Sequence, residues 1–336
     1  MIPKRLAQAL AWRLEHLGDR LERFRKALVV VNYHRLYARV LDTPFDRTVY
    51  GDISLDYFRR QLRWLKDNVQ VLSEDELLGC LDRPHTFPRR GVLLTFDDGY
   101  RDNYDLAFPA LREEGLPALF FIPTEPLLER RLGWWDVVAY LVGTSRRPVL
   151  ELEGTRHSLD GEAARRDCIH QLQERYKTLP EAQTRHLAAS LAEKLETQFP
   201  PAAVQDAELM TVPQLREMTG AGMAVGAHTH THRVLATLDP GEQRRELLQG
   251  KRILEERLGG RVHSLAYPVG RRDSFGEETK RLAREAGYAM AFSFYSGFNR
   301  PGSIDPMDVR RSSKRKPFDA FAASILYPRR ALAPSQ

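Results

Sequence analysis

Continuous apolar runs alternate with amphipathic stretches along most of the chain. Runs rich in Val, Leu, Ile and Phe predict buried strands at 27–33, 69–72, 91–96, 118–122, 223–227, 262–267 and 289–294. Apolar residues spaced three and four apart predict helices at 54–68, 103–114, 241–258 and 275–286. Because strand, helix and strand at this spacing place the two strands parallel, the pattern predicts an α/β protein with a parallel core.

Two segments depart from this alternation. In 1–28, leucines recur at helical spacing opposite basic residues, so we expect an amphipathic helix that either docks on the domain or lies on a membrane surface. In 125–210, strand signals nearly vanish and charged helical stretches dominate, at 161–177 and 181–197. We expect a helical insertion here, acting either as packing or as a lid or wall of a substrate site. The predicted organisation is a separate helix at 1–28 and one domain at 29–336, which 125–210 interrupts.

Composition narrows the class of protein only slightly. The chain has 336 residues, 42% of them hydrophobic and 29% charged, as in an ordinary globular protein. A net charge of +6 from 51 basic and 45 acidic residues is modest, so we expect no nucleic-acid partner. Cys80 and Cys168 lack zinc-ribbon spacing and make no disulfide framework. Residues 1–28 contain no uninterrupted apolar run of signal-peptide length, so we expect a cytoplasmic protein, which contacts the inner membrane peripherally if this helix lies on a membrane surface instead of docking on the domain.

The first group of candidate functional residues follows a predicted buried strand. Asp97 and Asp98 come directly after the strand at 91–96, and Gly99 allows the backbone to turn there. Two adjacent buried carboxylates are costly, because burial penalises each charge and like charges repel. A nearby cation would relieve both penalties. As a turn alone, Asp-Asp-Gly is common, so this segment does not establish a site by itself.

The second group contains three alternating histidines after another predicted strand. His228 and His232 are four residues apart, a spacing that brings both imidazoles to one ion in a helix or in a strand that runs into a turn. In a regular strand, His230 would share their face and compete as a ligand. Two imidazoles with one carboxylate form a common zinc site that leaves a position open for water. The segment therefore predicts a metal site.

Together, these segments resemble the polysaccharide deacetylase family, which is related to the chitooligosaccharide deacetylases. Thr95-Phe-Asp-Asp-Gly99 is similar to its first motif, His228-Thr-x-x-His232 to its second and Ala266-Tyr-Pro-x-Gly270 to its third. Tyr33-His-Arg35 and Trp134-Trp-Asp136 resemble segments of bacterial exopolysaccharide members. The resemblance spans roughly 29–124 and 208–312, and makes 29–336 a deacetylase-like catalytic domain.

The resemblance implies a distorted (β/α) barrel with fewer than eight regular strands. It also implies Zn²⁺, or another divalent ion such as Co²⁺, Ni²⁺ or Mn²⁺, bound by Asp98, His228 and His232, with Asp97 as the general base. His230 would then not bind metal. We assign substrate contacts to four aromatic and proline side chains near these motifs, namely Tyr100, Trp135, Tyr267 and Pro268. The backbone N–H of Tyr267 is our candidate for holding the oxyanion.

Two functional positions depart from the family pattern. The third motif has Ser264, Leu265 and Ala266 where the family often has an arginine that orients the base, so we expect Arg310 or Arg311 to act instead, and favour Arg311. The late Leu-x-His motif, which supplies the general acid, has no match after residue 300. We therefore expect His34 to be the general acid.

The expected activity is hydrolysis of a linear amide, removing an N-acetyl group from an amino sugar in a glycan or glycan precursor. The expected cytoplasmic location favours a lipid-linked or nucleotide-linked sugar as the substrate over a finished wall polymer. Two alternatives remain at this stage. One is a deformylase or other amidohydrolase on the same scaffold, and the other is a non-catalytic carbohydrate-binding protein.

Overall fold

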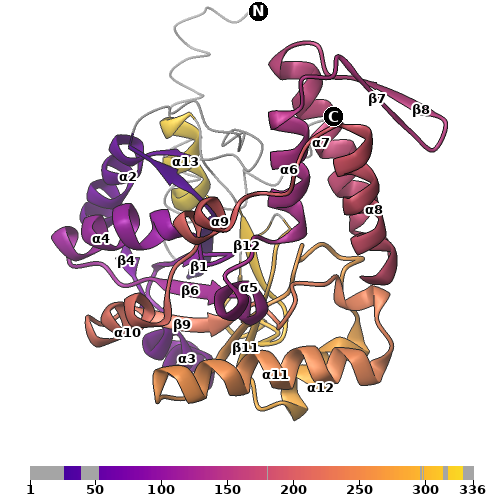
Figure 1. Ribbon diagram of the computed structural model, residues 1–336. Coiled ribbons are helices and arrows are strands. Elements are labelled where there is room, and N and C mark those ends of the chain that lie inside the picture. Colours follow the sequence, from indigo (N-terminus) through magenta and orange to yellow (C-terminus); the bar gives the residue numbers. More distant parts are fainter. Residues whose placement is uncertain are drawn as a thin grey trace, which may run out of the picture.

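The protein folds around a closed barrel of parallel strands (Figure 1). The computed structural model describes residues 26–38, 53–179, 181–295, 297, 299–312 and 317–327. Within these ranges, seven strands close the barrel, and β1 pairs with both β12 and β5. In barrel order they are β1 (Ala27–Tyr33), β12 (Val309–Ser312), β11 (Met290–Ser293), β10 (Ser264–Ala266), β9 (Ala224–Ala227), β6 (Leu119–Ile122) and β5 (Arg90–Phe96). The distorted (β/α) barrel predicted from the sequence is confirmed.

The pairing of β1 with β5 places the candidate catalytic residues at one edge. The register runs from Ala27 opposite Arg90 to Tyr33 opposite Phe96, and both strands are buried after their first residue. The N–H of Asp97 then donates to the carbonyl of Tyr33 at 3.1 Å. Because the two strands end together, the residues that follow them leave the barrel at the same rim, where parallel α/β folds gather their sites.

Helices cover the outside of the barrel (Figure 1). Several begin with a side-chain cap: Ser73 forms a capping box with Glu76, and Asp239 forms one with Glu242. The outer helices are α2 (Leu55–Asn68), α3 (Glu74–Asp82), α4 (Phe108–Glu114), α10 (Val212–Gly220), α11 (Pro240–Leu258), α12 (Glu277–Glu285) and α13 (Phe318–Leu326). The shorter elements are β2 (Leu36–Tyr37), β3 (Ile53–Ser54), β4 (Gln70–Val71), η1 (Pro84–Thr86), the π-helix η2 (Asn103–Ala107) and η3 (Leu235–Thr237).

The long segment between β6 and β9 forms a mainly helical insertion with its own apolar core. It contains α5 (Thr124–Glu129), α6 (Trp134–Thr144), β7 (Val149–Leu152), β8 (Thr155–Ser158), α7 (Gly161–Tyr176), α8 (Glu181–Lys194) and α9 (Ala202–Glu208). Figure 1 shows α6, α7 and α8 together on one side of the barrel. The antiparallel hairpin of β7 and β8 is not anticipated by the sequence analysis, because β8 is polar and mostly exposed.

Two further elements differ from the sequence-based expectations. Neither β12 nor α13 is predicted. For β12, the sequence Val-Arg-Arg-Ser at 309–312 has no apolar run that would indicate a buried strand. The predicted helix at 1–28 lies outside the described residues up to position 25, and Ala27 and Leu28 belong to β1. In the described part of the chain, no helix has both the length and the apolar character needed to cross a membrane.

A buried carboxyl group lies at the end of the barrel opposite the rim. Glu74 begins α3 and accepts a hydrogen bond from the hydroxyl of Ser264, the first residue of β10. Burial raises the pKa of Glu74 from its ordinary value of 4.5 to about 7. Between about pH 4.5 and 7, Glu74 therefore stays protonated in the folded protein but is ionised in the unfolded chain.

We expect this carboxyl to make the protein less stable as the pH rises from about 4.5 to 7, because the carboxyl ionises freely in the unfolded chain over this range, whereas burial opposes its ionisation in the folded protein. Glu74→Gln keeps an acceptor for Ser264 and carries no charge. At pH 8 the variant should be more stable than the wild type by about 2–3 kcal/mol, and near pH 4 the two should be equal. Urea denaturation at both pH values measures this, and a stability difference independent of pH would contradict it.

Candidate active site

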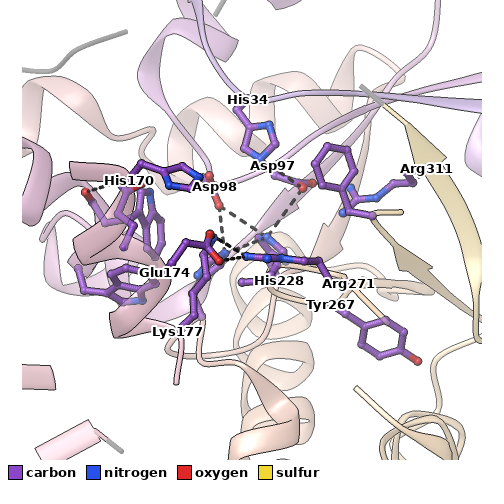
Figure 2. Close-up of a pocket in the computed structure, with 16 residues that line it drawn as sticks. His34, Asp97, Asp98, His170, Glu174, Lys177, His228, Tyr267, Arg271 and Arg311 are labelled. Atoms are coloured by element: carbon purple, nitrogen blue, oxygen red, sulfur yellow. Dashed lines mark hydrogen bonds and ion pairs between the residues drawn. The ribbon is translucent and has the colours of Figure 1, made fainter. Parts of the chain in front are cut away.

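A cavity of about 400 Å³ opens at the rim where the strands end. Its walls come from the barrel loops and from the insertion (Figure 2). From the barrel it is lined by His34, Asp97, Asp98, His228, His232, Tyr267, Val269, Arg271, Phe294 and Arg311, and from the insertion by Trp134, Trp135, His170, Gln173, Glu174 and Lys177. Most of the predicted site residues, although distant in sequence, therefore share one cavity.

One group of side chains is suited to a metal ion and is called the metal group below: Asp98, His228 and His232. Oδ1 of Asp98 lies 3.3 Å from Nε2 of His232 and 3.6 Å from Nε2 of His228, and the two Nε2 atoms are 3.1 Å apart. A tetrahedral ion with bonds of about 2.1 Å needs ligand atoms about 3.4 Å apart. All three side chains are buried. The donor set and its spacing therefore fit one divalent cation.

The backbone around these ligands is held in unusual conformations. Asp98 has φ 74°, Thr229 has φ 60° and His232 has φ 58°, in the left-handed region that L-residues rarely adopt. Gly99 continues the turn with φ 70°. Such conformations cost roughly 1–3 kcal/mol each and persist only where surrounding contacts enforce them. At this rim they turn two separate chain segments so that their side chains face one another.

His230 points away from the metal group. Its Nδ1 is 2.8 Å from the hydroxyl of Thr124, and its Nε2 is 2.9 Å from the side-chain nitrogen of Gln249. The left-handed turn at Thr229 breaks the alternation that a regular strand would have kept. The choice that the sequence left open, between His230 and His232, is thereby resolved by geometry in favour of His232.

Asp97 is buried beside the metal group and paired with a cation. Its Oδ1 accepts a hydrogen bond from Nη1 of Arg311 at 2.7 Å, and its Oδ2 accepts one from Nδ2 of Asn32 at 2.9 Å. Burial by itself would raise the pKa of Asp97, but the charge and hydrogen bond of Arg311, together with the nearby imidazoles of His228 and His34, outweigh it and hold that pKa below its ordinary value. Asp97 is therefore a carboxylate at neutral pH.

The structure places Arg311, rather than Arg310, at Asp97. The guanidinium of Arg311 lies inside the barrel, where its Nε donates to the carbonyl of Ser293 and its Nη1 also contacts Oδ1 of Asn32. Asn32 was missed by the sequence analysis. The available signal was a single amide side chain within the otherwise apolar run of β1.

His34 follows β1 and lines the cavity on the far side of Asp97. Its Nε2 is 3.9 Å from Oδ2 of Asp97, and Nε2 of His228 is also 3.9 Å from that oxygen. Figure 2 shows His34, Asp97 and His228 around one space. Oδ2 of Asp97 thus lies between the metal group and the imidazole of His34.

The residues assigned to substrate contact are placed differently from one another. Trp135 and Tyr267 line the cavity, whereas Tyr100 and Pro268 are buried and are not among its lining residues. The N–H of Tyr267 donates to the carbonyl of Phe292 at 3.0 Å, so the expectation that it holds an oxyanion is wrong. This N–H already donates a hydrogen bond to the neighbouring barrel strand β11.

Lining residues from α7 and from the loop after β10 were also missed. Glu174 in the insertion pairs with both Arg271 and Lys177, and this contact ties the insertion to the barrel (Figure 2). Burial opposes its ionisation, but hydrogen bonds from Arg271 and Lys177 lower the pKa of Glu174 to about 2. Periodicity cannot reveal such a contact, because it joins residues about 100 positions apart.

Two relatives of known sequence are named as deacetylases. The chain is 24% identical over 241 residues to YxkH of Bacillus subtilis, which is named as a polysaccharide deacetylase, covering 71% of this chain and 58% of that protein. It is 27% identical over 115 residues to the poly-β-1,6-N-acetyl-D-glucosamine N-deacetylase of Staphylococcus epidermidis, covering 32% of this chain and 39% of that one. The matches therefore span less than two thirds of either relative.

Solved structures share the fold at low sequence identity. The deacetylase PplD of Streptococcus pyogenes, in complex with acetate, has a TM-score of 0.58 and 19% identity, covering 87% of this chain and 93% of that one. IcaB from Ammonifex degensii has a TM-score of 0.54 and 22% identity, covering 90% and 97%. The family model described as polysaccharide deacetylase matches residues 85–143 and 173–291, more than half of the chain. This chain belongs to the polysaccharide deacetylase family.

Proposed function

We propose that the protein is a metal-dependent N-deacetylase that hydrolyses the acetamido group of an amino sugar in a glycan or glycan precursor. One observation carries the proposal. An ionised carboxylate, Asp97, lies 3.9 Å from a nitrogen of the Asp98, His228 and His232 group and is held there by Arg311. A base at the edge of a cation site is the arrangement that hydrolysis of an unreactive amide requires.

The cation we propose is Zn²⁺, with Co²⁺, Ni²⁺ or Mn²⁺ as alternatives. Two imidazoles and one carboxylate suit zinc and leave a coordination position open. When bound, such an ion polarises the acyl carbonyl and lowers the pKa of the attacking water.

The side chains of this chain then have distinct tasks. Asp97 takes a proton from water while the oxygen of that water adds to the carbonyl carbon. Oδ2 of Asp97, which lies near His34 and His228, accepts this proton. Arg311 and Asn32 bind Asp97 throughout, which fixes its orientation. The carbon–nitrogen bond breaks when the nitrogen is protonated, and we assign this proton to Nε2 of His34. The products are acetate and the free amine.

The substrate class follows from the cavity. A space of about 400 Å³ with walls from both the barrel and the insertion suits a sugar residue and its immediate neighbour. We propose a lipid-linked or nucleotide-linked N-acetylated sugar. Incubation of the metal-loaded protein with a panel of such carriers and with N-acetylated oligosaccharides, followed by assay of acetate and formate, tests the sugar and the acyl group together.

Asp97→Asn should abolish turnover while leaving metal binding intact. The amide cannot accept the proton from water, whereas Asp98, His228 and His232 are unchanged. We expect kcat to fall by 10²–10⁴-fold or more, and the metal content of the purified variant to equal that of the wild type. Acetate release and elemental analysis of the same sample measure both. Unchanged turnover would rule out Asp97 as the general base. No acetate release from the metal-loaded wild type would instead favour the non-catalytic carbohydrate-binding alternative.

His34→Ala should slow amide hydrolysis far more than hydrolysis of an aryl acetate. The amine is a poor leaving group and needs a proton, whereas an aryl oxide leaves without one. We expect kcat on the amide to fall by about 10²–10⁴-fold and kcat on the aryl ester to change by less than about fivefold. Asp97→Asn is the matched control, because it should lose both activities. A loss on the amide below about tenfold would rule out His34 as the general acid.

A further inference from the structure

The two imidazoles of the metal group are held by different means. Nδ1 of His228 is 2.8 Å from the carbonyl of Ala266, a contact that fixes its ring. Nδ1 of His232 is buried and has no hydrogen-bond partner in the described part of the chain. Histidines that bind metals are usually oriented by a hydrogen bond from their second nitrogen. His232 therefore needs another support.

An aromatic ring from the insertion provides that support. The indole of Trp135 lies against the imidazole of His232, with ring centroids 4.1 Å apart and planes tilted by 46°. Trp135 is the second residue of α6 and is only 6% exposed, so little of the ring is left for contact with a sugar. The contact joins the insertion directly to a metal ligand.

The position of Trp135 is itself fixed by a buried polar network. Its Nε1 donates to the hydroxyl of Tyr100 at 2.6 Å, and that hydroxyl donates to Oδ2 of Asp136 at 3.0 Å. The guanidinium of Arg35 lies 3.7 Å from the centre of the Tyr100 ring and 3.6 Å from Oδ1 of Asp136. The network joins the segment after β1, the loop after Asp98 and the start of α6 through buried contacts.

Two further contacts hold α6 in place around the same side chain. Nε2 of Gln173, from α7, donates to the backbone carbonyl of Trp135 at 3.1 Å. A Cβ at Gly133 would lie 2.2 Å from the indole, so glycine is required where the ring folds back over the start of the helix. Gly133 therefore leaves room for the ring in its position against His232.

We propose that Trp135 is a positioning residue for the metal ligand His232, and that the insertion thereby completes the metal centre. This inference rests on the proposed function, because it takes Asp98, His228 and His232 as the ligands. An imidazole that is already confined loses less side-chain entropy when it binds an ion. Metal affinity, and not only substrate contact, then depends on the insertion.

The test is the affinity of the full chain for Zn²⁺, measured by competition with a chromophoric chelator, with the absorption spectrum of the Co²⁺ form as a report on ligand geometry. Trp135→Leu removes the ring and should raise the dissociation constant about tenfold or more, as when other orienting partners of metal ligands are removed. Trp135→Phe retains a ring over His232 and should stay within about threefold of the wild type. Tyr100→Phe frees the indole and should give an intermediate value.

Leu191→Ala is the matched control, because Leu191 is buried in the insertion core on α8, outside the network. It should lower the thermal stability while leaving zinc affinity and the cobalt spectrum unchanged. Unchanged zinc affinity in both Trp135→Leu and Tyr100→Phe would overturn the inference while leaving the proposed function standing. If the wild type binds no divalent ion, both fail together.

Discussion

Everything at the rim of the barrel depends on keeping two adjacent, buried carboxylates ionised. Asp97 and Asp98 directly follow β5 and are almost completely buried, so burial penalises each charge and the charges repel one another. The chain resolves this by separating the two side chains. Asp97 faces the fixed cation of Arg311, and Asp98 turns through a left-handed backbone conformation toward His228 and His232. One carboxylate is thus paired with a fixed cation, and the other faces two imidazoles with which it could hold a metal ion.

Each part of the surrounding structure supports that separation. The closed barrel brings β12 beside β1, so that Arg311 reaches Asp97 across the interior. Positive φ values at the site, including one at the β-branched Val269, turn side chains toward the cavity at a cost that the barrel packing offsets. The insertion adds a wall and contacts His232 through Trp135. The barrel, the left-handed backbone turns and the insertion therefore together position Asp97, Asp98 and His232.

The sequence predicted those parts of the fold that depend on local pattern. The apolar runs of β1, β5, β6, β9, β10 and β11 indicate buried parallel strands, and apolar residues at helical spacing indicate α2, α4, α11 and α12. It did not predict β12, because the two arginines in this strand give it a polar sequence. The strand is nevertheless largely buried, since Arg311 pairs with Asp97 inside the barrel. It missed Asn32 and the bridge between Glu174 and Arg271, since these contacts join distant positions that no periodicity links. The grouping of Asp98, His228 and His232 was predicted because their residue types suit a metal ion, whereas the hydrogen bond from the Tyr267 N–H to β11 is visible only in three dimensions.

The most direct test of this account is anomalous diffraction from zinc-loaded crystals at the zinc absorption edge. The account predicts a single strong peak bonded to a carboxylate oxygen of Asp98 and to Nε2 of both His228 and His232 at about 2.0–2.1 Å, with Asp97 nearby but still paired to Arg311. A peak bonded to His230, or to Asp97 in place of Asp98, would contradict it.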